Sequence, residues 1–493
     1  MVSPILTVAE MRAAEEAAFA RGTTAESLMD EAARGIAAAV SSIFPQPARC
    51  IVFAGKGNNA GDAFAAAELL SRDGWQVDVR LAFNEADLGT LARNKLASLR
   101  AALAGNATSC HLQPQLIVLD GLLGIGATPP LREPICSAGR ELNRLRTERN
   151  AFVFAIDVPS GLDADTGDGD ADCVVADWTV TIGFAKRGLI ADAALEFVGR
   201  LEVAPLSVEP EHQPSAAVLA TRDSLRPLLR RRAFGAYKNQ FGRIGIVAGS
   251  RGFTGAAVLC SLGALRGGAG LVQLFVPEEI YELIAASAPP EVMVKPVTSY
   301  RGIADEPIDV WAVGPGLGRE HDAAILDLIA SVAAPMVLDA DALNALATHM
   351  PLLQQPCGPR LVTPHPGEMK RLFPRAGLSR AAQAEEFCAQ YPVTLLLKGS
   401  RTIVAGHGAP SSYNTTGNPG MSTGGMGDVL TGVCAALIGQ KLSPSDAARL
   451  GAWVCGRAAE LAIFRGTASE QSLLPSDVIA HLGLAFRELQ SEV

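Results

Sequence analysis

A glycine-rich stretch late in the chain carries the residues with the clearest chemical potential. Residues 418–430 read Asn-Pro-Gly-Met-Ser-Thr-Gly-Gly-Met-Gly-Asp-Val-Leu, and we expect a helix that begins near Asp428. The backbone N–H groups of such a helix start can form a hole for developing phosphate charge. A carboxylate at that place can orient or deprotonate an attacking hydroxyl. The stretch predicts transfer of a phosphoryl group to a hydroxyl, and a helix cap after a flexible loop is the simpler alternative.

More polar segments follow predicted strands in this half. His365 lies between two prolines on a rigid loop, which favours a binding role over a core role. Lys398 ends a later strand and could meet a nucleotide phosphate or ribose, and a solvated loop cation is the alternative. The segments are Gly314-Pro315-Gly316-Leu317-Gly318, Asp339-Ala340-Asp341, Thr363-Pro364-His365-Pro366-Gly367-Glu368 and Lys398-Gly399-Ser400-Arg401-Thr402.

A second glycine-rich turn lies in the first half. Residues 55–62 read Gly-Lys-Gly-Asn-Asn-Ala-Gly-Asp, after an apolar run and before a helical pattern. Glycines let the backbone approach a phosphate, and the helix start supplies N–H donors. Gly55-x-Gly57-x-x-Ala60, with Asp78 further on, also matches the permissive dinucleotide fingerprint of dehydrogenases. A turn that only joins strand to helix is the simplest alternative.

Two more polar stretches follow later strands of the same half, at Asp120 and at Asp157. The carboxyl ends of parallel strands meet at one edge of an open sheet, where ligands bind. Asn59, Asp120 and Ser160 offer oxygen donors that suit an alkali or alkaline-earth cation. Asp157 could serve as general acid or base. Any single Asp could instead cap the next helix, so the prediction of a site rests on the set.

The elements that must position these residues alternate between short apolar runs and helical patterns. Residues 8–40 are predicted to be largely helical, because Leu28, Ala32, Ile36 and Val40 recur at helical spacing. Apolar runs without polar alternation are typical of strands buried on both faces of a parallel sheet. The predicted strands are 50–54, 76–81, 116–119, 152–158, 178–182, 244–248, 271–276, 310–313, 336–338, 361–363, 393–397 and 402–404.

This rhythm predicts an α/β fold with two domains, the first a Rossmann-like doubly wound sheet. Pro205, Pro210 and Pro214 interrupt the rhythm. We therefore expect a first domain over residues 1–208, a linker over 209–222 and a second domain over 223–493.

Composition narrows the classes of function. The 493 residues carry a formal net charge of −9 without a long basic run, which disfavours nucleic acid as a partner. The nine scattered cysteines form no C-x-x-C pair and predict reduced thiols. The first residues lack the features of a secretory signal, and no apolar run reaches the roughly 18 residues of a membrane span. We expect a cytoplasmic homo-oligomer that has no membrane partner.

The first half resembles the NAD(P)H-hydrate epimerase family, which carries G-x-G-N-N-G-G-D-G, D-x-L-L-G-x-G and D-x-P-S-G-L-x-x-D-T-G stretches. Lys186-Arg187-Gly188-Leu189 also belongs to the resemblance. It implies K⁺ at Asn59, Asp120 and Ser160, and Asp157 as the catalytic acid/base that interconverts the two epimers of the hydrate. It implies that the hydrated dinucleotide contacts Asp157 and also Asn58, Asn59, Ala60, Gly61, Asp62, Gly124, Ile125, Gly126, Ala127, Thr128, Pro129 and Pro130.

Two alanines depart from the family pattern. Ala60 and Ala63 stand where the family usually has glycine. A Cβ at either position could require a changed backbone or crowd the ligand.

The second half resembles the ribokinase-like superfamily, and more closely its ADP/ATP-dependent NAD(P)H-hydrate dehydratase branch, through T-P-H-P-G-E and N-P-G-M-x-T-G-G-M-G-D-V-L. The resemblance implies a ribokinase-like α/β domain that uses Mg²⁺ with ADP or ATP, and Asp428 as the catalytic residue. It implies hydrate contacts at Ala256, Gly318, His365 and Asp428. It implies nucleotide contacts at Lys398, Gly399, Ser400, Arg401, Thr402 and Gly427.

Together the two resemblances predict a bifunctional enzyme that repairs hydrated NADH and NADPH, small-molecule substrates. The first domain would epimerise the R and S hydrates, and the second would dehydrate the S form. One alternative is a ribokinase-like vitamin or sugar kinase with a non-catalytic binding module in its first domain. A dehydrogenase is a further alternative, and it would require hydride transfer to an added substrate.

Overall fold

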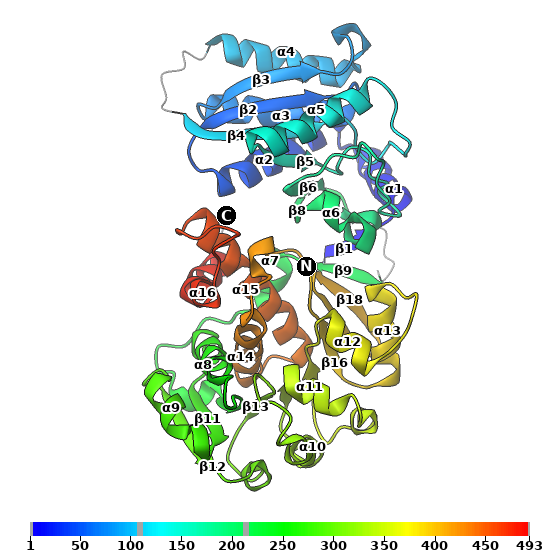
Figure 1. The fold of residues 1–493 in the computed structure, drawn as a ribbon. Helices are drawn as coiled ribbons and strands as arrows, with labels where there is room; N and C mark the ends of the chain where they lie inside the picture. The colour runs from blue at the N-terminus through cyan, green and yellow to red at the C-terminus, as the bar shows by residue number, and fades with distance from the viewer. Residues whose placement is uncertain (1–2, 106–111, 211–215, 492–493) are drawn as a thin grey trace. The chain divides into compact units, whose positions relative to one another are not determined.

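The computed structural model of the chain describes residues 3–105, 112–210 and 216–491. The chain divides into two compact units, Ser3–Ser215 and Ala216–Val493. Each unit is built on its own sheet with helices packed against it (Figure 1). The prediction of an α/β fold with two domains is confirmed.

Six parallel strands form the main sheet of the first unit, in the order β3-β2-β4-β5-β6-β8. Its middle strands are buried on both faces: Ile51 and Phe53 pack in a cluster with residues of α5, and the alternate residues Cys50 and Val52 are also fully buried. The strands are β2 (Ala48–Ala54), β3 (Gln76–Leu81), β4 (Gln113–Gly121), β5 (Phe152–Ile156), β6 (Trp178–Ile182) and β8 (Arg200–Ala204).

The strand order creates a crevice at one place in this sheet. If these six strands are counted along the chain, with β2 as strand 1 and β8 as strand 6, their order in the sheet is 2-1-3-4-5-6. The chain therefore passes from β2 to β3 on one side, and then crosses to β4 on the other side of β2. The connections after β2 and β4 therefore diverge, and such a switch point is where doubly wound sheets bind ligands. The turn at Gly55 and the turn at Gly121 both lie there.

The helices of this unit are α1 (Val8–Ala20), α2 (Ala25–Ile43), α3 (Asn58–Arg72), α4 (Thr90–Gly105), α5 (Ile135–Arg149) and the short α6 (Leu195–Val198). Thr7 caps α1 in a capping box with Glu10, which fixes where the helix begins. Helices α2, α3 and α4 pack against one another, and α5 contacts β4. The unit also contains a short parallel pair, β1 (Ser3–Leu6) with β7 (Ala185–Lys186), which is not part of the six-stranded sheet.

The second unit contains a larger sheet in the order β12-β11-β10-β13-β14-β15-β16-β17-β18-β9. The pairs along β12-β11-β10-β13-β14-β15-β16 are all parallel, and β17 pairs antiparallel with both β16 and β18. The strands are β9 (Ala217–Ala220), β10 (Arg243–Val247), β11 (Leu271–Pro277), β12 (Val292–Val297), β13 (Val310–Val313), β14 (Met336–Leu338), β15 (Arg360–Val362), β16 (Thr394–Leu397), β17 (Ile403–Gly406) and β18 (Ala409–Asn414).

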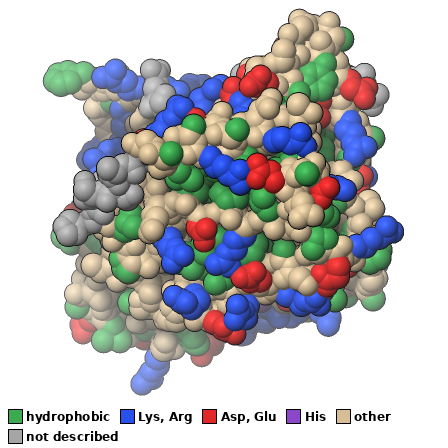
Figure 2. All heavy atoms as spheres, turned by 90° about the horizontal axis from the view of Figure 1, so that it is seen from above, with side chains coloured by type: hydrophobic (Ala, Val, Ile, Leu, Met, Phe, Trp, Pro, Cys, Tyr) green, Lys and Arg blue, Asp and Glu red, His purple; other side chains and the backbone are tan. Residues whose placement is uncertain are grey.

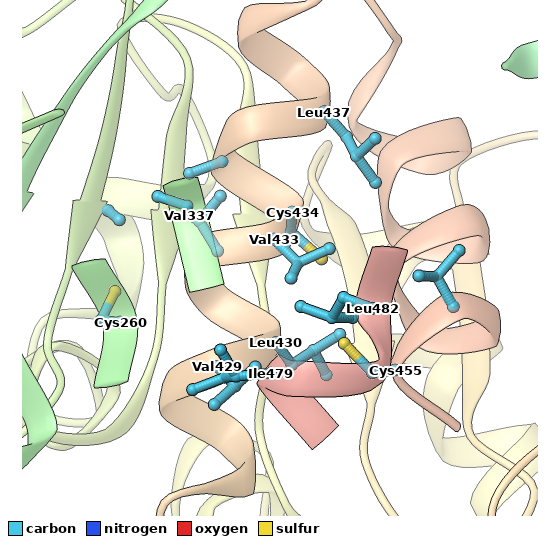
Figure 3. Close-up of a cluster of buried hydrophobic side chains, with 14 of the residues drawn as sticks. Cys260, Val337, Val429, Leu430, Val433, Cys434, Leu437, Cys455, Ile479 and Leu482 are labelled. Carbon is cyan, nitrogen blue, oxygen red and sulfur yellow. The ribbon is translucent and has the colours of Figure 1, made fainter. Parts of the chain in front are cut away.

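A helical layer centred on α14 forms the core of this unit. Helix α14 packs closely against α8, and α15 packs against both α14 and α16. Val433, Cys434 and Leu437 of α14 lie among side chains of α15 and α16, including Cys455 and Leu482 (Figure 3). The helices are α7 (Arg222–Leu225), α8 (Thr254–Arg266), α9 (Tyr281–Ser287), α10 (Asp322–Ser331), α11 (Ala340–Leu346), α12 (Pro366–Leu372), α13 (Arg380–Gln390), α14 (Met426–Gly439), α15 (Pro444–Phe464) and α16 (Pro475–Gln490).

The twelve predicted strands coincide with strands of the structure to within a few residues, but the sequence reasoning missed six others. Strands β8 and β12 mix polar with apolar residues, and β1, β7, β9 and β18 are short or lie in polar segments. Strand β9 lies inside the predicted linker and pairs in parallel with β18. Part of that linker, residues 211–215, is outside the described residues.

The surface is mixed in charge. Figure 2 shows acidic and basic side chains interspersed over one face, with apolar side chains between them. Within the described residues, no helix is long and apolar enough to cross a membrane. Eight cysteines of the described residues are free thiols, and Cys110 lies outside those residues.

Close packing of α8 on α14 depends on glycines. A Cβ on Gly432 would lie 2.0 Å from the carbonyl oxygen of Cys260, and one on Gly263 would lie 2.4 Å from that of Val429. Backbone atoms cannot move aside as a flexible side chain can, so the two helices would have to separate.

We therefore expect Gly432→Ala to destabilise the second unit by about 2 kcal/mol. Gly483→Ala is the matched control, since a Cβ there meets open space within helix α16. It should be neutral or slightly stabilising, because alanine favours helix over glycine. Urea unfolding followed by circular dichroism measures both, and equal midpoints for the two variants would contradict the packing argument.

Candidate active sites

A cavity of about 500 Å³ lies at the switch point of the first unit. It is bounded by α1 and α2, by the start of α3, and by the turn after β4. Its size falls within the range of small-molecule sites. The charged and polar residues that line it are Arg12, Glu15, Lys56, Asn58, Asn59, Asp62, Asp157 and Lys186.

Asp157 is held at the wall of this cavity by an unusual backbone. It follows β5 with φ at 67°, a left-handed conformation that a non-glycine residue adopts at a cost. Its Oδ1 accepts a hydrogen bond from Lys186 Nζ at 2.5 Å and from the backbone N–H of Ile182 at 3.2 Å. Lys186, whose side chain is 1% exposed, also donates to the Ile182 carbonyl at 2.8 Å. The carboxylate is thus buried, oriented and paired.

Two more carboxyl groups line the same cavity. Burial raises the pKa of Asp62 well above its ordinary value, and the negative charges of Asp157 and Glu15 add to that effect. Burial also raises the pKa of Glu15, with a further contribution from Asp157. The charge of Lys186 opposes both shifts, and the cavity therefore holds two carboxyl groups that take up a proton more readily than exposed ones do.

A set of oxygen donors lies beside the cavity. The Oδ1 of Asp120 accepts from the Ser160 hydroxyl at 2.7 Å, and Oδ2 accepts from the Ser160 N–H at 2.8 Å. Asn59 Nδ2 donates to the Leu123 carbonyl at 2.7 Å, so the amide oxygen points the other way, toward Gly124. Burial raises the pKa of Asp120 to about 6. The predicted residues Asn59, Asp120 and Ser160 are brought together, and a carboxylate with neutral oxygens is a donor set that suits an alkali or alkaline-earth cation.

The structure separates the predicted dinucleotide contacts into two groups. Asn58, Asn59, Asp62 and the turn 124–127 line the cavity. Ala60 is fully buried, and Gly61 faces Met29, whose methyl carbon would lie 2.5 Å from a Cβ. Thr128, Pro129 and Pro130 continue the turn beyond the residues that line the cavity.

The two alanines that replace glycine are accommodated. Helix α3 begins at Asn58, so Ala60 and Ala63 both have helical backbone, which alanine adopts readily. Ala63 packs where a Cβ on Gly121 would be 2.5 Å from its own Cβ, and it faces the interior of the unit. Neither alanine demands a changed backbone.

In the second unit, the glycine-rich stretch ends in the first turn of α14. Gly425 caps the helix with φ at 95°, and Asp428 lies in the first turn. Burial and, to a smaller extent, the charge of Asp339 raise the pKa of Asp428 to about 7, although the charge of Lys398 opposes both. A carboxyl group that titrates near neutral pH is suited to take a proton from a substrate hydroxyl.

Lys398 lies beside this turn and is paired with a buried acid. Its Nζ is 2.6 Å from Asp339 Oδ1 and 3.8 Å from Glu368 Oε2. A Cβ on Gly427 would be 3.3 Å from the same Nζ, so Lys398 and Gly427 are neighbours. Residues 399–402, which are also predicted to contact the nucleotide, form a turn after β16. Arg380 of α13 donates to the Ser400 carbonyl of this turn at 2.9 Å.

The other predicted hydrate contacts lie on loops after neighbouring strands. Gly316, after β13, approaches Ala256, whose Cβ would be 2.9 Å from a Cβ on that glycine. Gly318 has φ at 68° and donates its N–H to Asp341 at 2.8 Å. His365 caps α12: its Nδ1 accepts from the Gly367 N–H at 3.0 Å, and the ring remains half exposed. The other ring nitrogen, Nε2, lies 3.5 Å from Glu368 Oε1.

Several residues of these sites were not assigned a role from sequence. Lys186 lies within a family motif, and Asp339 and Glu368 lie within polar segments that follow strands, so a signal existed for all three. Glu15 and Arg12 belong to α1, where an Ala- and Glu-rich helical pattern hides them. Only the fold brings α1 to the cavity.

Comparison with known proteins covers both units. A family model described as NAD(P)H-hydrate dehydratase matches residues 244–480, and one described as YjeF-related protein N-terminus matches residues 25–188. The bifunctional NAD(P)H-hydrate repair enzyme of Moorella thermoacetica is 36% identical over 482 residues, covering 90% of this chain and 88% of the relative. That of Escherichia coli is 33% identical over 485 residues, with 96% and 91% covered. A solved structure, a hypothetical protein of Streptococcus mutans, is 20% identical, covers 55% of this chain and 100% of its own, and has a TM-score of 0.50.

The buried pair Asp157–Lys186 yields a stability prediction. Lys186→Met leaves the buried carboxylate of Asp157 without its charged partner and should destabilise the first unit by about 3 kcal/mol. Adding Asp157→Asn should recover part of that loss, because no charge then remains unpaired. Urea unfolding measures the series.

Lys56→Met serves as the control, since Lys56 is an exposed lysine on the rim of the same cavity. A loss for Lys186→Met no larger than for this control would contradict the importance of the pair.

Proposed function

Because the chain belongs to the family of bifunctional NAD(P)H-hydrate repair enzymes, we propose that Asp157 and Asp428 are the catalytic residues of its two activities. The chain is an NAD(P)H-hydrate epimerase and an ADP- or ATP-dependent NAD(P)H-hydrate dehydratase. The observation that supports the assignment is a carboxyl group in each site: Asp157 is buried directly after β5, and Asp428 is partly buried in the first turn of α14. The alternative of a kinase with a non-catalytic first domain is not favoured.

In the first unit, the hydrated nicotinamide ring is proposed to bind against Asp157. Asn58, Asn59, Asp62 and residues 124–127 surround that place. Asp157 takes the proton of the C6 hydroxyl as the C6–N1 bond breaks to give an open-chain aldehyde, with the bonding pair going to N1. It returns the proton when N1 adds to the other face of that carbon, and Lys186 holds the carboxylate in position. Ala60, Gly61 and residues 128–130 are the remaining proposed contacts of the hydrated dinucleotide, and they lie outside the residues that line the cavity.

K⁺ is the proposed cation of the first unit, held by Asn59, Asp120 and Ser160. When bound, it would neutralise the buried Asp120 carboxylate and fix the turn after β4 that faces the ligand. The raised pKa of Asp120 supports this proposal, because a buried carboxylate without a countercharge favours its protonated form.

In the second unit, Asp428 is proposed to deprotonate the C6 hydroxyl of the S hydrate. The terminal phosphoryl group of ADP or ATP is transferred to that oxygen. The C6–O bond then breaks, phosphate leaves, and loss of a proton from C5 restores the dihydronicotinamide ring. The N–H groups at the start of α14 would stabilise the negative charge of the transferring group.

The remaining contacts of this unit follow from the same arrangement. Ala256, Gly318 and His365 would hold the hydrate, while residues 398–402 and Gly427 would hold the nucleotide. Mg²⁺ would accompany the nucleotide and neutralise its phosphates, as phosphoryl transfer requires.

We also propose that the enzyme is a cytoplasmic homo-oligomer. The free thiols of the described residues support a reducing compartment. The exposed side chains of Phe234 and Tyr237 offer apolar surface for self-association.

Two single variants test the assignment in one assay. With a mixture of R and S hydrates, ADP or ATP, Mg²⁺ and K⁺, the wild-type chain should restore NADH absorbance for the whole mixture. Asp157→Asn should restore only the S fraction quickly, with the rest following at the spontaneous rate. Asp428→Asn should restore none, yet still bind nucleotide. Near-normal turnover in either variant would remove that residue from its proposed role.

The cation proposal is tested without activity. Replacing tetramethylammonium chloride by KCl at constant ionic strength should raise the melting temperature of the wild-type chain at pH 7.5. The increase should fade as pH falls below about 6, where Asp120 is protonated. Asp120→Asn should lose it at both pH values. An increase that survives in Asp120→Asn would place the cation elsewhere.

A further inference from the structure

Lys398 does not extend into solvent as a loop lysine would. Its ammonium donates to Asp339 Oδ1 at 2.6 Å and lies 3.8 Å from Glu368 Oε2. The side chain of Asp339 is 1% exposed, and that of Lys398 is 18% exposed. Burial alone would lower the pKa of Lys398, but Asp339 and Glu368 outweigh it and raise the pKa above its ordinary value. The lysine is therefore a fixed positive charge.

The acid that holds Lys398 is also tied to α14. Thr431 Oγ1, one turn after Asp428, donates to Asp339 Oδ2 at 2.8 Å. Burial would raise the pKa of Asp339, but the charge and hydrogen bond of Lys398 and the hydrogen bond of Thr431 lower it. One carboxylate thus joins the end of β14, the end of β16 and the first turns of α14.

The ammonium of Lys398 lies against the first turn of α14, at Gly427. A Cβ there would lie 3.3 Å from Lys398 Nζ and 3.5 Å from Asp339 Oδ2. A cation at the start of a helix is opposed by the positive end of the helix dipole. Asp339 offsets that cost, so the protein maintains a positive charge where helix geometry alone would not place one.

We propose that Lys398 is a positioning residue of the dehydratase, which Asp339 and Thr431 lock against the first turn of α14 so that its charge stabilises the ionised carboxylate of Asp428. This inference rests on the proposed role of Asp428. It alters the prediction for Lys398, whose ammonium is committed to Asp339, and leaves the nucleotide to residues 399–402 and Gly427.

The two charges act on Asp428 in opposite directions. Among the described residues, the charged groups that influence it are Asp339 and Lys398, and its own charge influences the buried thiol of Cys260 on α8. Asp339 raises the pKa of Asp428, and Lys398 lowers it. Removing each partner should therefore move the titration of Asp428 in opposite directions, which general structural damage would not do.

The test is the pH dependence of kcat for dehydration of the S hydrate at saturating nucleotide and Mg²⁺, from pH 6 to 9. The acid limb is the low-pH side of this profile, where kcat falls as Asp428 becomes protonated. Lys398→Met should move the acid limb to higher pH, and Asp339→Asn should move it to lower pH. A displacement by about one pH unit changes kcat about tenfold at a fixed pH on that limb. Lys398→Arg retains the charge and should return most of the limb toward that of the wild type.

Two controls accompany these variants. Lys370→Met makes the same substitution at an exposed lysine of α12 and should leave the limb unchanged. The epimerase activity of each variant, measured on the same chain, reports whether the first unit is intact, and circular dichroism melting reports the second. Nucleotide dissociation constants from calorimetry should change less than about threefold, because Lys398 is not a phosphate ligand in this proposal.

The outcomes separate cleanly. Unmoved acid limbs with a loss confined to nucleotide affinity would overturn the proposal and make Lys398 a nucleotide ligand. Limbs that move in the same direction in both charge variants would also overturn it. If Asp339→Asn fails to fold, the two lysine variants still test the proposal. An acid limb that does not move in Lys398→Met, or that does not return toward the wild type in Lys398→Arg, overturns the proposal. A wild-type chain that does not dehydrate the hydrate would instead refute the proposed function.

Discussion

A buried acid paired with a lysine at the carboxyl edge of a parallel sheet organises each unit of this protein. In the first unit the pair is Asp157 with Lys186 at 2.5 Å, and in the second it is Asp339 with Lys398 at 2.6 Å. Neither charge could be buried alone, because desolvation would cost several kcal/mol. Each pair therefore fixes the loops that follow its strands, and those loops carry the residues proposed to bind ligand.

The two pairs use the same chemistry for different ends. Asp157 is itself the proposed catalytic group, so Lys186 acts on it directly, while Asp62 and Glu15 surround it with groups whose pKa values are raised. Asp339 is one step removed: it holds Lys398, which faces the turn that contains Asp428. Lys186 thus orients the proposed catalytic acid itself, whereas Lys398 lies beside the turn that carries Asp428, whose pKa is raised to about 7 mainly by burial.

The position of Asp428 depends on how α14 is held. Glycines at 263 and 432 bring α8 and α14 into backbone contact, and the apolar face of α14 packs among α15 and α16 (Figure 3). Thr431 then links the polar side of the same helix to Asp339. Dense packing on one face and one hydrogen bond on the other leave the first turn little freedom, which suits a proton-transfer group that must meet a hydroxyl at hydrogen-bond distance.

The sequence by itself determined the two α/β domains, most of their buried strands, and the motifs of both sites, because local hydrophobic patterns and glycine-rich turns are properties of short segments. It identified Asn59, Asp120 and Ser160 as a set from the fact that strand ends meet at one edge of a sheet. Only the tertiary structure decided that Ala60 and Ala63 lie inside a helix, that Glu15 reaches the first cavity, and that Lys398 pairs with Asp339. These three features depend on which segments become neighbours and on the free-energy cost of burying a charge. The spacing of residues along the chain determines neither of them.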